Sequence, residues 1–313
     1  MSSAVTVLVL SVDEDEHLRT CLPAIVGQDG ADVVVVDNAC TDSTPEVAEE
    51  MGARVLRISH RTSYAGALNV AIGATGGELV LLLNADCIVD PDFVAPLRET
   101  LAADPGLGSA APKLLRADGL AVDTAGVTVD RRRKNGLVGH CAPAGGYGLP
   151  GPVFGGDGAA VLWRRRALED CAVGSEVLDE DMALWATESD LAWRAQLRGW
   201  GCAYEPRAVG RHLRTYSPSV ERSALAVEHR RMQFRNRLLM MYKNDTAWGL
   251  LRDWPRIVAY EVAALGYALL RERELLGAYR DFLAARPAAA RRRRVIQTRA
   301  SVRRPPFGLV PPR

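Results

Sequence analysis

The chain has 313 residues, of which 48% are hydrophobic and 25% charged, and a formal net charge of +1 at pH 7, values that are ordinary for one large or two small globular domains. Its six cysteines are scattered without a Cys-x-x-Cys pair, which argues against a zinc site or a disulfide framework and favours reduced thiols in a cytoplasmic protein. No basic region precedes an apolar core at the start, and the best apolar run, residues 257–270, is too short to span a bilayer, so neither a signal peptide nor a transmembrane helix is expected.

The first hundred residues predict strands that alternate with helices. Continuous apolar or β-branched runs indicate strands over residues 5–12, 33–36, 54–58 and 79–83. Helical spacing of apolar residues predicts helices over residues 18–25, from Pro45 onward, and over residues 64–74. This alternation is typical of right-handed βαβ units, so the expected fold class is α/β, with a mostly parallel sheet flanked by helices.

Polar side chains follow three of these strands, at the point where each strand ends. They are Ser11, Asp13, Asp37, Asn38, Asn84 and Asp86. Because the carboxyl ends of parallel strands meet at one edge of a sheet, we expect these side chains to gather at a ligand site. Asn84 and Asp86 lie two apart and can face the same side to hold Mg²⁺ or Mn²⁺, although Asn and Asp also favour turns for local reasons. No glycine-rich phosphate loop follows the first strand, so neither a dinucleotide nor a P-loop triphosphate is expected.

The middle of the chain is less regular. A helix over residues 91–103 and a short strand over 108–112 precede a Gly- and Pro-rich connection, 113–152, that we expect to be flexible and partly ordered. Its basic cluster, residues 131–134, indicates a solvated loop or a contact with an anionic acceptor. A helix from residue 187 carries Glu188 and Asp190 at its start, where the helix dipole stabilises carboxylates without any catalysis. Two short strand-like pieces then precede His212.

The composition changes from residue 223 onward. Amphipathic helices broken near Pro255 are followed by the apolar helix 257–270, which arginines flank. Two interpretations remain open, a helical appendage packed on the preceding domain or a peripheral contact with anionic membrane lipid, and we slightly favour the second. Nucleic-acid binding is not expected, because the Arg-rich tail lacks aromatic platforms. Residues 299–313 are predicted to be disordered.

Three segments in order along the chain, 34–44, 82–86 and 188–200, resemble the inverting family 2 glycosyltransferases of the GT-A fold. The nearest group is that of bacterial rhamnosyltransferase-like proteins, which make cell-wall or surface polysaccharide, and segments 235–244 and 292–297 resemble it as well. The resemblance implies a Rossmann-like GT-A catalytic domain over residues 1–222. Its nucleotide-sugar half would cover about 1–112 and its acceptor half about 113–222, followed by the helical region 223–298.

The resemblance also implies roles for single residues. Ser11, Asp13, Asp37 and Asn38 would hold the base and ribose of a nucleotide sugar. Asn69 matches a polar position near the nucleotide and the donor sugar. Asn84 and Asp86 match the metal motif, and His212 matches the histidine that completes the metal shell of Mn²⁺ or Mg²⁺.

The expected reaction needs two kinds of group. A divalent cation stabilises the charge of the diphosphate leaving group, and a carboxylate takes the proton of the acceptor hydroxyl, so that displacement inverts the anomeric centre. Glu188 is the first choice for this base and Asp190 the second. The sequence departs from the family in two places, because Asn84 stands where the family often has Asp and Thr187-Glu188 stands where it usually has Glu-Asp.

These observations predict a metal-dependent hexosyltransferase. It would move a sugar, with rhamnose suggested by the resemblance, from a dTDP-, UDP- or GDP-linked donor to a hydroxyl of a glycan or lipid-linked glycan. The expected location is the cytoplasm, peripherally on the inner face of the cell membrane. One alternative is a GT-A module that binds nucleotide without transfer. A nucleotidyltransferase is a weaker alternative, because residues 13–16 are acidic where it would need a basic loop.

Overall fold

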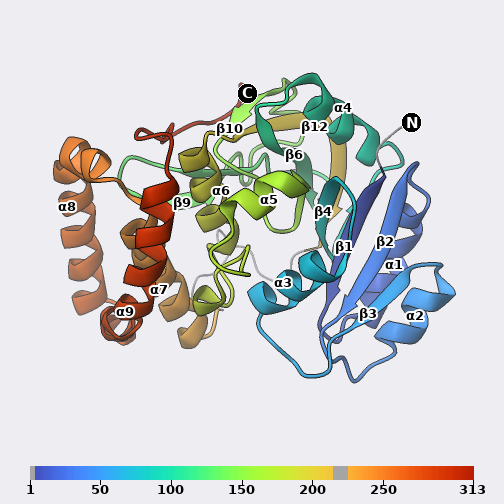
Figure 1. The fold of residues 1–313 in the computed structure, drawn as a ribbon, viewed down its shortest axis with the longest axis horizontal. Coiled ribbons are helices and arrows are strands. Elements are labelled where there is room, and N and C mark those ends of the chain that lie inside the picture. Colours follow the sequence, from blue (N-terminus) through green and yellow to red (C-terminus); the bar gives the residue numbers. More distant parts are fainter. Residues whose placement is uncertain (1–3, 214–224) are drawn as a thin grey trace.

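The structure is a computed structural model that describes residues 4–213 and 225–313. A 10-stranded mixed sheet forms its centre, with the strand order β10-β12-β6-β11-β4-β1-β2-β3 and with β5 and β7 paired to β12 and β6. The helices α7, α8 and α9 lie at one end of the molecule, and β1, β2 and β3 lie at the other (Figure 1).

The N-terminal half follows the predicted alternation. Its elements are β1 (Val5–Ser11), α1 (Asp15–Val26), β2 (Ala31–Asp37), α2 (Thr44–Glu50), β3 (Arg54–Arg57), α3 (Tyr64–Ala74) and β4 (Leu79–Asn84). The strands β1, β2, β3 and β4 pair in parallel, with β1 between β2 and β4. Both β1 and β4 are buried on their two faces, which explains why their sequences are continuous apolar runs rather than alternating ones.

The second half of the sheet mixes strand directions. Its elements are β5 (Cys87–Val89), α4 (Val94–Ala103), β6 (Leu107–Arg116), β11 (Ala160–Arg164), α5 (Arg165–Cys171), a 3₁₀ turn (Glu180–Met182), α6 (Thr187–Arg198) and β12 (Gly201–His212). The strand β11 runs antiparallel to β4 and β6, whereas β12 runs parallel to β6. The expected α/β sheet flanked by helices is therefore confirmed, with an antiparallel strand in its middle.

Two layers of helices cover the sheet because successive side chains of a strand point to opposite faces. Val7 and Val9 of β1 pack in a buried cluster with residues of α1, α2 and α4. Leu8 and Leu10 pack in a second cluster with residues of α3, α5 and α6. The helix α6 therefore lies over the same face of the sheet as α3.

The connection 113–152 is not the flexible segment that its composition suggested. It contains β7 (Val122–Thr124), β8 (Val127–Val129) and β9 (Asn135–Leu137), and β10 (Gly151–Val153) follows directly. Val122, Val138, Tyr147 and Tyr204 are buried together in a hydrophobic cluster that joins this segment to β12. These apolar residues are too widely spaced to be recognised as a core from the sequence, since the glycines and prolines between them dominate the pattern.

The basic cluster 131–134 is a solvated loop only in part, because Arg132 and Lys134 are exposed whereas Arg133 is not. The Arg133 side chain is fully buried, and its Nε lies 2.6 Å from Asp245 Oδ2. Its Nη1 lies 3.0 Å from Asp253 Oδ2, and its guanidinium stacks 4.0 Å from the ring centroid of Phe307. The two aspartates belong to the C-terminal region, so this arginine ties that region to the preceding domain.

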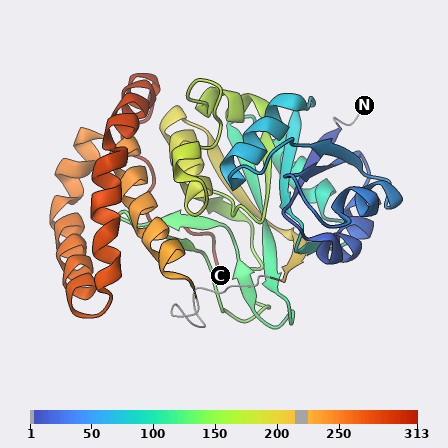
Figure 2. The same ribbon diagram turned by 90° about the horizontal axis from the view of Figure 1, so that it is seen from below.

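The C-terminal helices form a bundle beside the sheet domain (Figure 2). They are α7 (Val227–Asn244), α8 (Ala247–Leu270) and α9 (Leu276–Arg299), with a 3₁₀ turn at Arg273–Leu275. The predicted break near Pro255 is absent, because α8 runs through this proline. Pro255 is exposed, so water can satisfy the carbonyl that loses its helical partner there.

The tail after Arg299 is ordered, in contrast to the predicted disorder. The backbone N–H groups of Ser301 and Val302 donate to Leu197 O at 2.8 and 2.9 Å. The Phe307 ring lies 5.0 Å from the Trp193 ring in an edge-on arrangement. One aromatic anchor and a few backbone bonds hold a segment whose Pro and Arg content alone indicated disorder.

Candidate active site

The polar strand ends meet where the sheet reverses its strand order. In the register of β1 and β2, Ser11 pairs with Asp37, and in the register of β1 and β4, Leu10 pairs with Asn84. These are the carboxyl ends of parallel strands on the two sides of β1, which is the place where open α/β sheets bind ligands. The structure thus brings Ser11, Asp37 and Asn84 to one edge, as the sequence predicted.

Hydrogen bonds fix the loops that follow β1 and β2. Asn38 is buried and exchanges two bonds of 2.9 Å with the backbone of Thr62. Asp13 accepts from Thr41 N at 2.6 Å and from Arg61 Nη2 at 2.7 Å. These bonds and the charge of Arg61 hold the pKa of Asp13 below its usual range. The expected ligand-binding residues Asp13 and Asn38 thus lie in the loops after β1 and β2, which we call the rim and which internal hydrogen bonds hold in place. Arg61 also belongs to this rim, and it was not predicted from the sequence.

The rim also contains the one group of three possible metal ligands found among residues 4–213 and 225–313. It consists of Asp13, Cys40 and Asp42. Asp13 and Asp42 already accept backbone N–H groups, and burial raises the pKa of the Cys40 thiol, which keeps it protonated. A hydrogen-bonded loop accounts for this cluster, so we do not assign a metal to it.

Asp86 and His212 approach each other below this rim. His212 is the last residue of β12, which pairs antiparallel with β5, the strand that begins directly after Asp86. The Asp86 Oδ1 atom lies 3.2 Å from His212 Nε2. Burial would raise the pKa of Asp86, but the hydrogen bond and the charge of His212 bring this pKa below its ordinary value. The two predicted metal ligands are therefore neighbours, 126 positions apart in the sequence.

A third residue orients this histidine. Asp123 is buried in β7, and its Oδ2 lies 2.9 Å from His212 Nδ1. A carboxylate at Nδ1 keeps a proton on that nitrogen, so Nε2, which faces Asp86, is the nitrogen that could give up its proton and bind a cation instead. Carboxylate–histidine pairs of this kind are typical of metal-ligating histidines, so Asp86 and His212 fit a hard divalent cation. Asp123 was missed because it lies in the connection that the sequence reading took as flexible.

Glu188 lies on the other side of the site, in the first turn of α6. The glycine bend before β11 makes this position possible, because a Cβ on Gly155 would lie 2.3 Å from Ala192 Cβ of α6. A Cβ on Gly158 would lie 3.0 Å from Tyr64 Oη and 3.9 Å from Glu188 Cβ. The Tyr64 hydroxyl donates to Gly158 O at 3.1 Å, so Tyr64 and Glu188 both lie beside the glycine bend.

The electrostatics of Glu188 differ from those of a surface carboxylate. Burial and the charge of Asp157 raise the pKa of Glu188 to about 7. Burial and the charges of Glu188, Asp157 and Asp86 also raise the pKa of Tyr64, so the three carboxylates lie within electrostatic range of one phenol. A carboxylate with a pKa near neutrality can take and return a proton at physiological pH. No role of its own was predicted for Asp157, which stands inside the glycine-rich bend.

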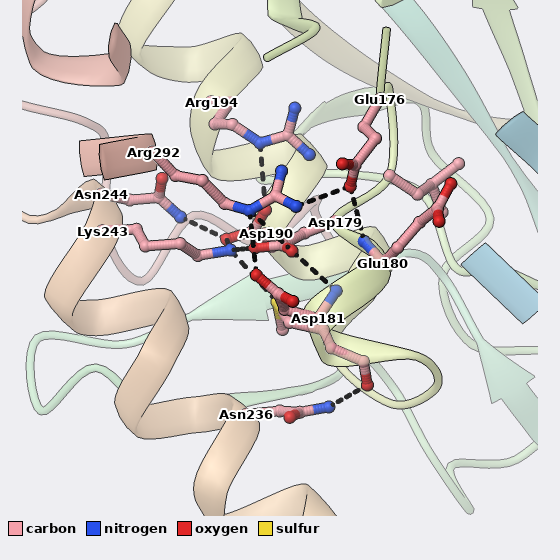
Figure 3. Close-up of polar contacts among 12 residues, drawn as sticks. Glu176, Asp179, Glu180, Asp181, Asp190, Arg194, Asn236, Lys243, Asn244 and Arg292 are labelled. Atoms are coloured by element: carbon pink, nitrogen blue, oxygen red, sulfur yellow. Dashed lines mark hydrogen bonds and ion pairs between the residues drawn. The ribbon is translucent and has the colours of Figure 1, made fainter. Parts of the chain in front are cut away.

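Asp190 is not part of this arrangement. Its side chain is fully buried, with Arg194 Nε at 3.0 Å, Lys243 Nζ at 2.9 Å and Asn244 Nδ2 at 2.8 Å (Figure 3). Three donors bind this carboxylate, and its burial keeps it away from a substrate. Residues two apart on a helix point to different sides, so only one of the two candidate bases could face the site.

Asn69 has a structural role as well. Its Nδ2 donates to Leu178 O and Glu180 Oε1, both at 2.9 Å, and its Oδ1 accepts from Val177 N and Leu178 N at 3.1 and 2.9 Å. All four hydrogen-bonding positions of the amide are used by the segment before α6. The structure therefore gives Asn69 a role in holding this segment rather than in direct ligand contact.

The residues just before α6 have an uncommon backbone. Ala183, Trp185 and Ala186 have positive φ angles of 60°, 61° and 59°, each of which costs on the order of 1 kcal/mol for a residue with a Cβ. Asn236 of α7 is buried, and its Nδ2 donates to three carbonyl oxygens of this segment, at 2.8, 2.6 and 3.0 Å. The carbonyls are those of Met182, Leu184 and Trp185. The helix α7 thus holds the strained turn that directly precedes the α6 residue Glu188.

Comparison with known proteins finds a family likeness in the N-terminal third of the chain. Residues 6–112 match the family model described as Glycosyl transferase family 2. Over 214 residues, or 66% of this chain, the sequence is 22% identical to a poly-beta-1,6-N-acetyl-D-glucosamine synthase of Staphylococcus aureus. The chain spans between 16% and 48% of the length of the curated relatives it matches.

Two solved structures share the fold over most of the chain. A mannosyltransferase of Pyrobaculum calidifontis, solved with GDP-Man and Mn²⁺, aligns with a TM-score of 0.54 at 20% identity and covers 95% of this chain and 79% of its own. Residues 1–349 of S. aureus TarS, solved with UDP-GlcNAc, align with a TM-score of 0.57 at 15% identity and cover 95% and 87%. At these identities the likeness shows the fold, which is of the GT-A type.

Proposed function

We propose that this chain, which carries a Glycosyl transferase family 2 domain on a GT-A fold, is a glycosyltransferase that moves a sugar from a nucleotide-diphosphate donor to a hydroxyl acceptor with inversion. The observation that carries the proposal is Glu188, a carboxylate with its pKa raised to about 7, in a site that also contains Asp86. A base of this kind beside a metal-binding motif is what displacement at an anomeric carbon requires.

The donor would bind at the rim formed by the ends of β1 and β2. Ser11, Asp13, Asp37 and Asn38 line this rim, where backbone and side-chain groups can hydrogen-bond a base and a ribose. We assign the nucleotide-sugar half to residues 1–112, close to the family match at 6–112, and the acceptor half to residues 113–222. The proposed donor carries uridine, thymidine or guanosine diphosphate, because the charge of the rim residues does not select one of these three bases.

A divalent cation, Mn²⁺ or Mg²⁺, would be held by Asp86 and His212. When bound, it would supply positive charge for the diphosphate leaving group. Asn84, two residues before Asp86, contributes an oxygen without adding charge, so we expect weaker metal binding than an aspartate there would give. The role of Asp123 in this chemistry is to keep His212 in the correct tautomer.

Glu188 would accept the proton of the acceptor hydroxyl as the hydroxyl attacks the anomeric carbon. Burial and, to a smaller extent, the charge of Asp157 keep the pKa of Glu188 high, which makes Glu188 a stronger base once it is ionised. Glu188 and Asp86 both lie within electrostatic range of the Tyr64 phenol, so the proposed base and a proposed metal ligand share one site.

The finer identity of the substrates rests on the family resemblance. We infer a hexose donor, with rhamnose as the first sugar to test, and a glycan or lipid-linked glycan acceptor used in cell-wall or surface polysaccharide. The similarity to the poly-beta-1,6-N-acetyl-D-glucosamine synthase of S. aureus supports a role in polysaccharide synthesis.

The experiment that tests the proposal is a thermal-shift panel. The full chain is heated with UDP-, dTDP- and GDP-sugars, each with and without Mn²⁺, beside Asp86→Ala and the exposed control Asp92→Ala. A ligand that binds only the folded state raises the melting temperature by mass action. A metal-dependent shift with one nucleotide class, lost in Asp86→Ala and kept in Asp92→Ala, is expected. Equal shifts in both variants would contradict the metal role.

A further inference from the structure

The helix α8 directs charged side chains toward the protein and apolar side chains toward the outside, which is the reverse of a typical surface helix of a water-soluble protein. Its polar contacts face the protein, because Asp253 pairs with Arg133 at 3.0 Å and Glu261 pairs with Arg237 at 2.6 Å. The Tyr260 ring also faces inward, 4.9 Å below the Arg237 guanidinium. A soluble helix normally buries its apolar stripe and exposes its charges. The burial of these ion pairs therefore leaves the apolar side of α8 without a partner among residues 4–213 and 225–313.

The exposed side carries a continuous apolar row. Its members are 40% to 66% exposed and recur at intervals of three and four residues, which places them on one face of the helix. They are Leu251, Trp254, Val258, Val262, Leu265 and Leu269. We call this row the α8 stripe. The helix has 24 residues, or about 36 Å at 1.5 Å per residue, and the stripe follows most of that length.

Basic residues surround the α8 stripe. Arg252 and Arg256 are exposed at its start, and Arg271 and Arg273 are exposed just beyond its end. Residues 225–313 contain 19 Lys and Arg but 7 Asp and Glu, a net charge of +12 in a chain whose total is +1. The remainder of the chain is therefore acidic, and the two ends of the molecule carry opposite charge.

We propose that the α8 stripe is a docking surface for an anionic lipid membrane, with α8 lying in the plane of the interface. Apolar side chains would enter the acyl boundary, and the flanking arginines would contact lipid phosphates, each contributing about 1 kcal/mol near the surface. None of the helices in the described ranges 4–213 and 225–313 has the length and hydropathy to cross a bilayer, which fits an in-plane helix. The proposal goes beyond the transfer reaction and does not depend on it.

The charge of this region selects lipid over a second copy of the chain. A symmetric dimer through α8 would bring two regions of net charge +12 together, and their repulsion would oppose association. An anionic surface attracts the same charge. The position of α8, at the end of the molecule far from β2 and β3, would leave the nucleotide edge of the sheet open to the aqueous phase (Figure 1).

A vesicle co-sedimentation assay tests the proposal. The full chain is mixed at low salt with vesicles of phosphatidylglycerol and phosphatidylcholine, or with vesicles of phosphatidylcholine alone. We expect binding to the first and weak binding to the second. In the triple variant Leu251→Ser, Val258→Ser and Val262→Ser, partition into the anionic vesicles should fall about tenfold or more, because several buried CH₂ equivalents are lost.

Two further variants of this chain serve as controls for the vesicle assay. The control Leu120→Ser with Leu149→Ser removes apolar groups that are 75% and 56% exposed elsewhere, and it should bind vesicles as the native chain does. The charge variant Arg252→Glu with Arg256→Glu should lose the preference for phosphatidylglycerol. Melting temperatures should stay within a few degrees in all variants, since every changed residue is exposed.

Two results would overturn the proposal. Equal vesicle binding by the native chain and the triple variant would remove the α8 stripe as the contact. A concentration-dependent dimer in light scattering, absent in the triple variant and with no vesicle binding by the native chain, would assign the stripe to a second copy instead. Donor-induced thermal shifts are measured on the same samples, so that loss of lipid binding and failure of the transferase proposal are told apart.

Discussion

The first turn of α6 carries a carboxylate on each of two sides, Glu188 and Asp190, and the charges around the two carboxylates have opposite signs. Glu188 lies near Asp157, and burial together with the charge of Asp157 raises its pKa to about 7. Asp190 faces the C-terminal bundle, where Arg194 and Lys243 lower its pKa against the effect of burial. The helix N-terminus is common to both residues, so the dipole alone does not decide which carboxylate is reactive.

The difference shows what the bundle contributes to the site. Lys243 and Asn244 come from the end of α7, and Arg292 of α9 pairs with the neighbouring Asp179 at 3.1 Å (Figure 3). These cations neutralise the acids on one side of the turn and leave the acids on the other side uncompensated. The C-terminal helices are therefore part of the construction of the active-site turn, and the two carboxylates can be tested against each other.

The largest effect is expected at the site-facing side. Glu188→Gln keeps the shape of the side chain but cannot accept a proton, so turnover should fall by roughly 10²- to 10⁴-fold. The donor-induced thermal shift should remain, because Glu188 does not contact the rim. Asp157→Asn is the matched comparison, and a larger loss of turnover in that variant would move the base from Glu188 to Asp157.

The next effect concerns the bundle-facing side. Asp190→Ala leaves Lys243 and Arg194 without their shared partner in a buried place, which should cost about 3–5 kcal/mol in the free energy of unfolding. Urea denaturation measures this loss, with the exposed Asp92→Ala as control. A cost below about 1 kcal/mol would mean that the ion pairs around Asp190 do not stabilise the turn.

The pH dependence of stability distinguishes the two sides further. Because the folded-state pKa of Glu188 is about 7 and its ordinary value is 4.5, the native chain loses stability as the pH rises from about 5 to 8. Glu188→Gln removes this loss, so at pH 8 in EDTA the variant should be more stable than the native chain, on the order of 1–3 kcal/mol. At pH 5 the two proteins should be nearly equal. A variant that is less stable at pH 8 would contradict the raised pKa.

A smaller effect is expected from the residue behind the metal-binding pair. Asp123→Asn keeps the size of the side chain but weakens its hold on the His212 proton, so the apparent Mn²⁺ affinity should fall about 10- to 100-fold. The concentration of Mn²⁺ that gives half of the donor-induced thermal shift measures this change. If this Mn²⁺ concentration is unchanged in Asp123→Asn, the contact between Asp123 and His212 does not contribute to metal binding.

The smallest effect concerns the strained turn between the two sides. Asn236→Ala removes the amide that holds three carbonyls before Glu188, and turnover should fall about tenfold with little change in donor affinity. In a double-mutant cycle, Asn236→Ala should have little further effect in the Glu188→Gln background. Additive losses would show that Asn236 acts on stability alone.

Much of the fold could be predicted from the sequence, because its signals are local. The apolar runs at residues 79–83 and 33–36 predicted β4 and β2, and residues 64–74 matched α3. The polar residues predicted at the ends of β1, β2 and β4 do lie at one edge of the sheet, and Asp86 and His212, which the resemblance named together, are neighbours.

The missed features depend on contacts between distant parts of the chain. Arg133 reaches Asp245 across 112 residues, and Asp123 reaches His212 across 89. Neither pairing leaves a periodic pattern in the sequence. Positions two apart on a helix face different sides, so the sequence indicated that only one of Glu188 and Asp190 could face the site, but not which one.

The most direct test of this account is the release of nucleoside diphosphate from the donor identified by the thermal-shift panel, with Mn²⁺, as a function of pH. We expect metal-dependent turnover that falls as the pH drops below about 7, because protonated Glu188 cannot act as a base. Glu188→Gln should lose this turnover and keep its donor-induced shift. Near-normal release by Glu188→Gln, with the same acidic limb, would contradict the central claim.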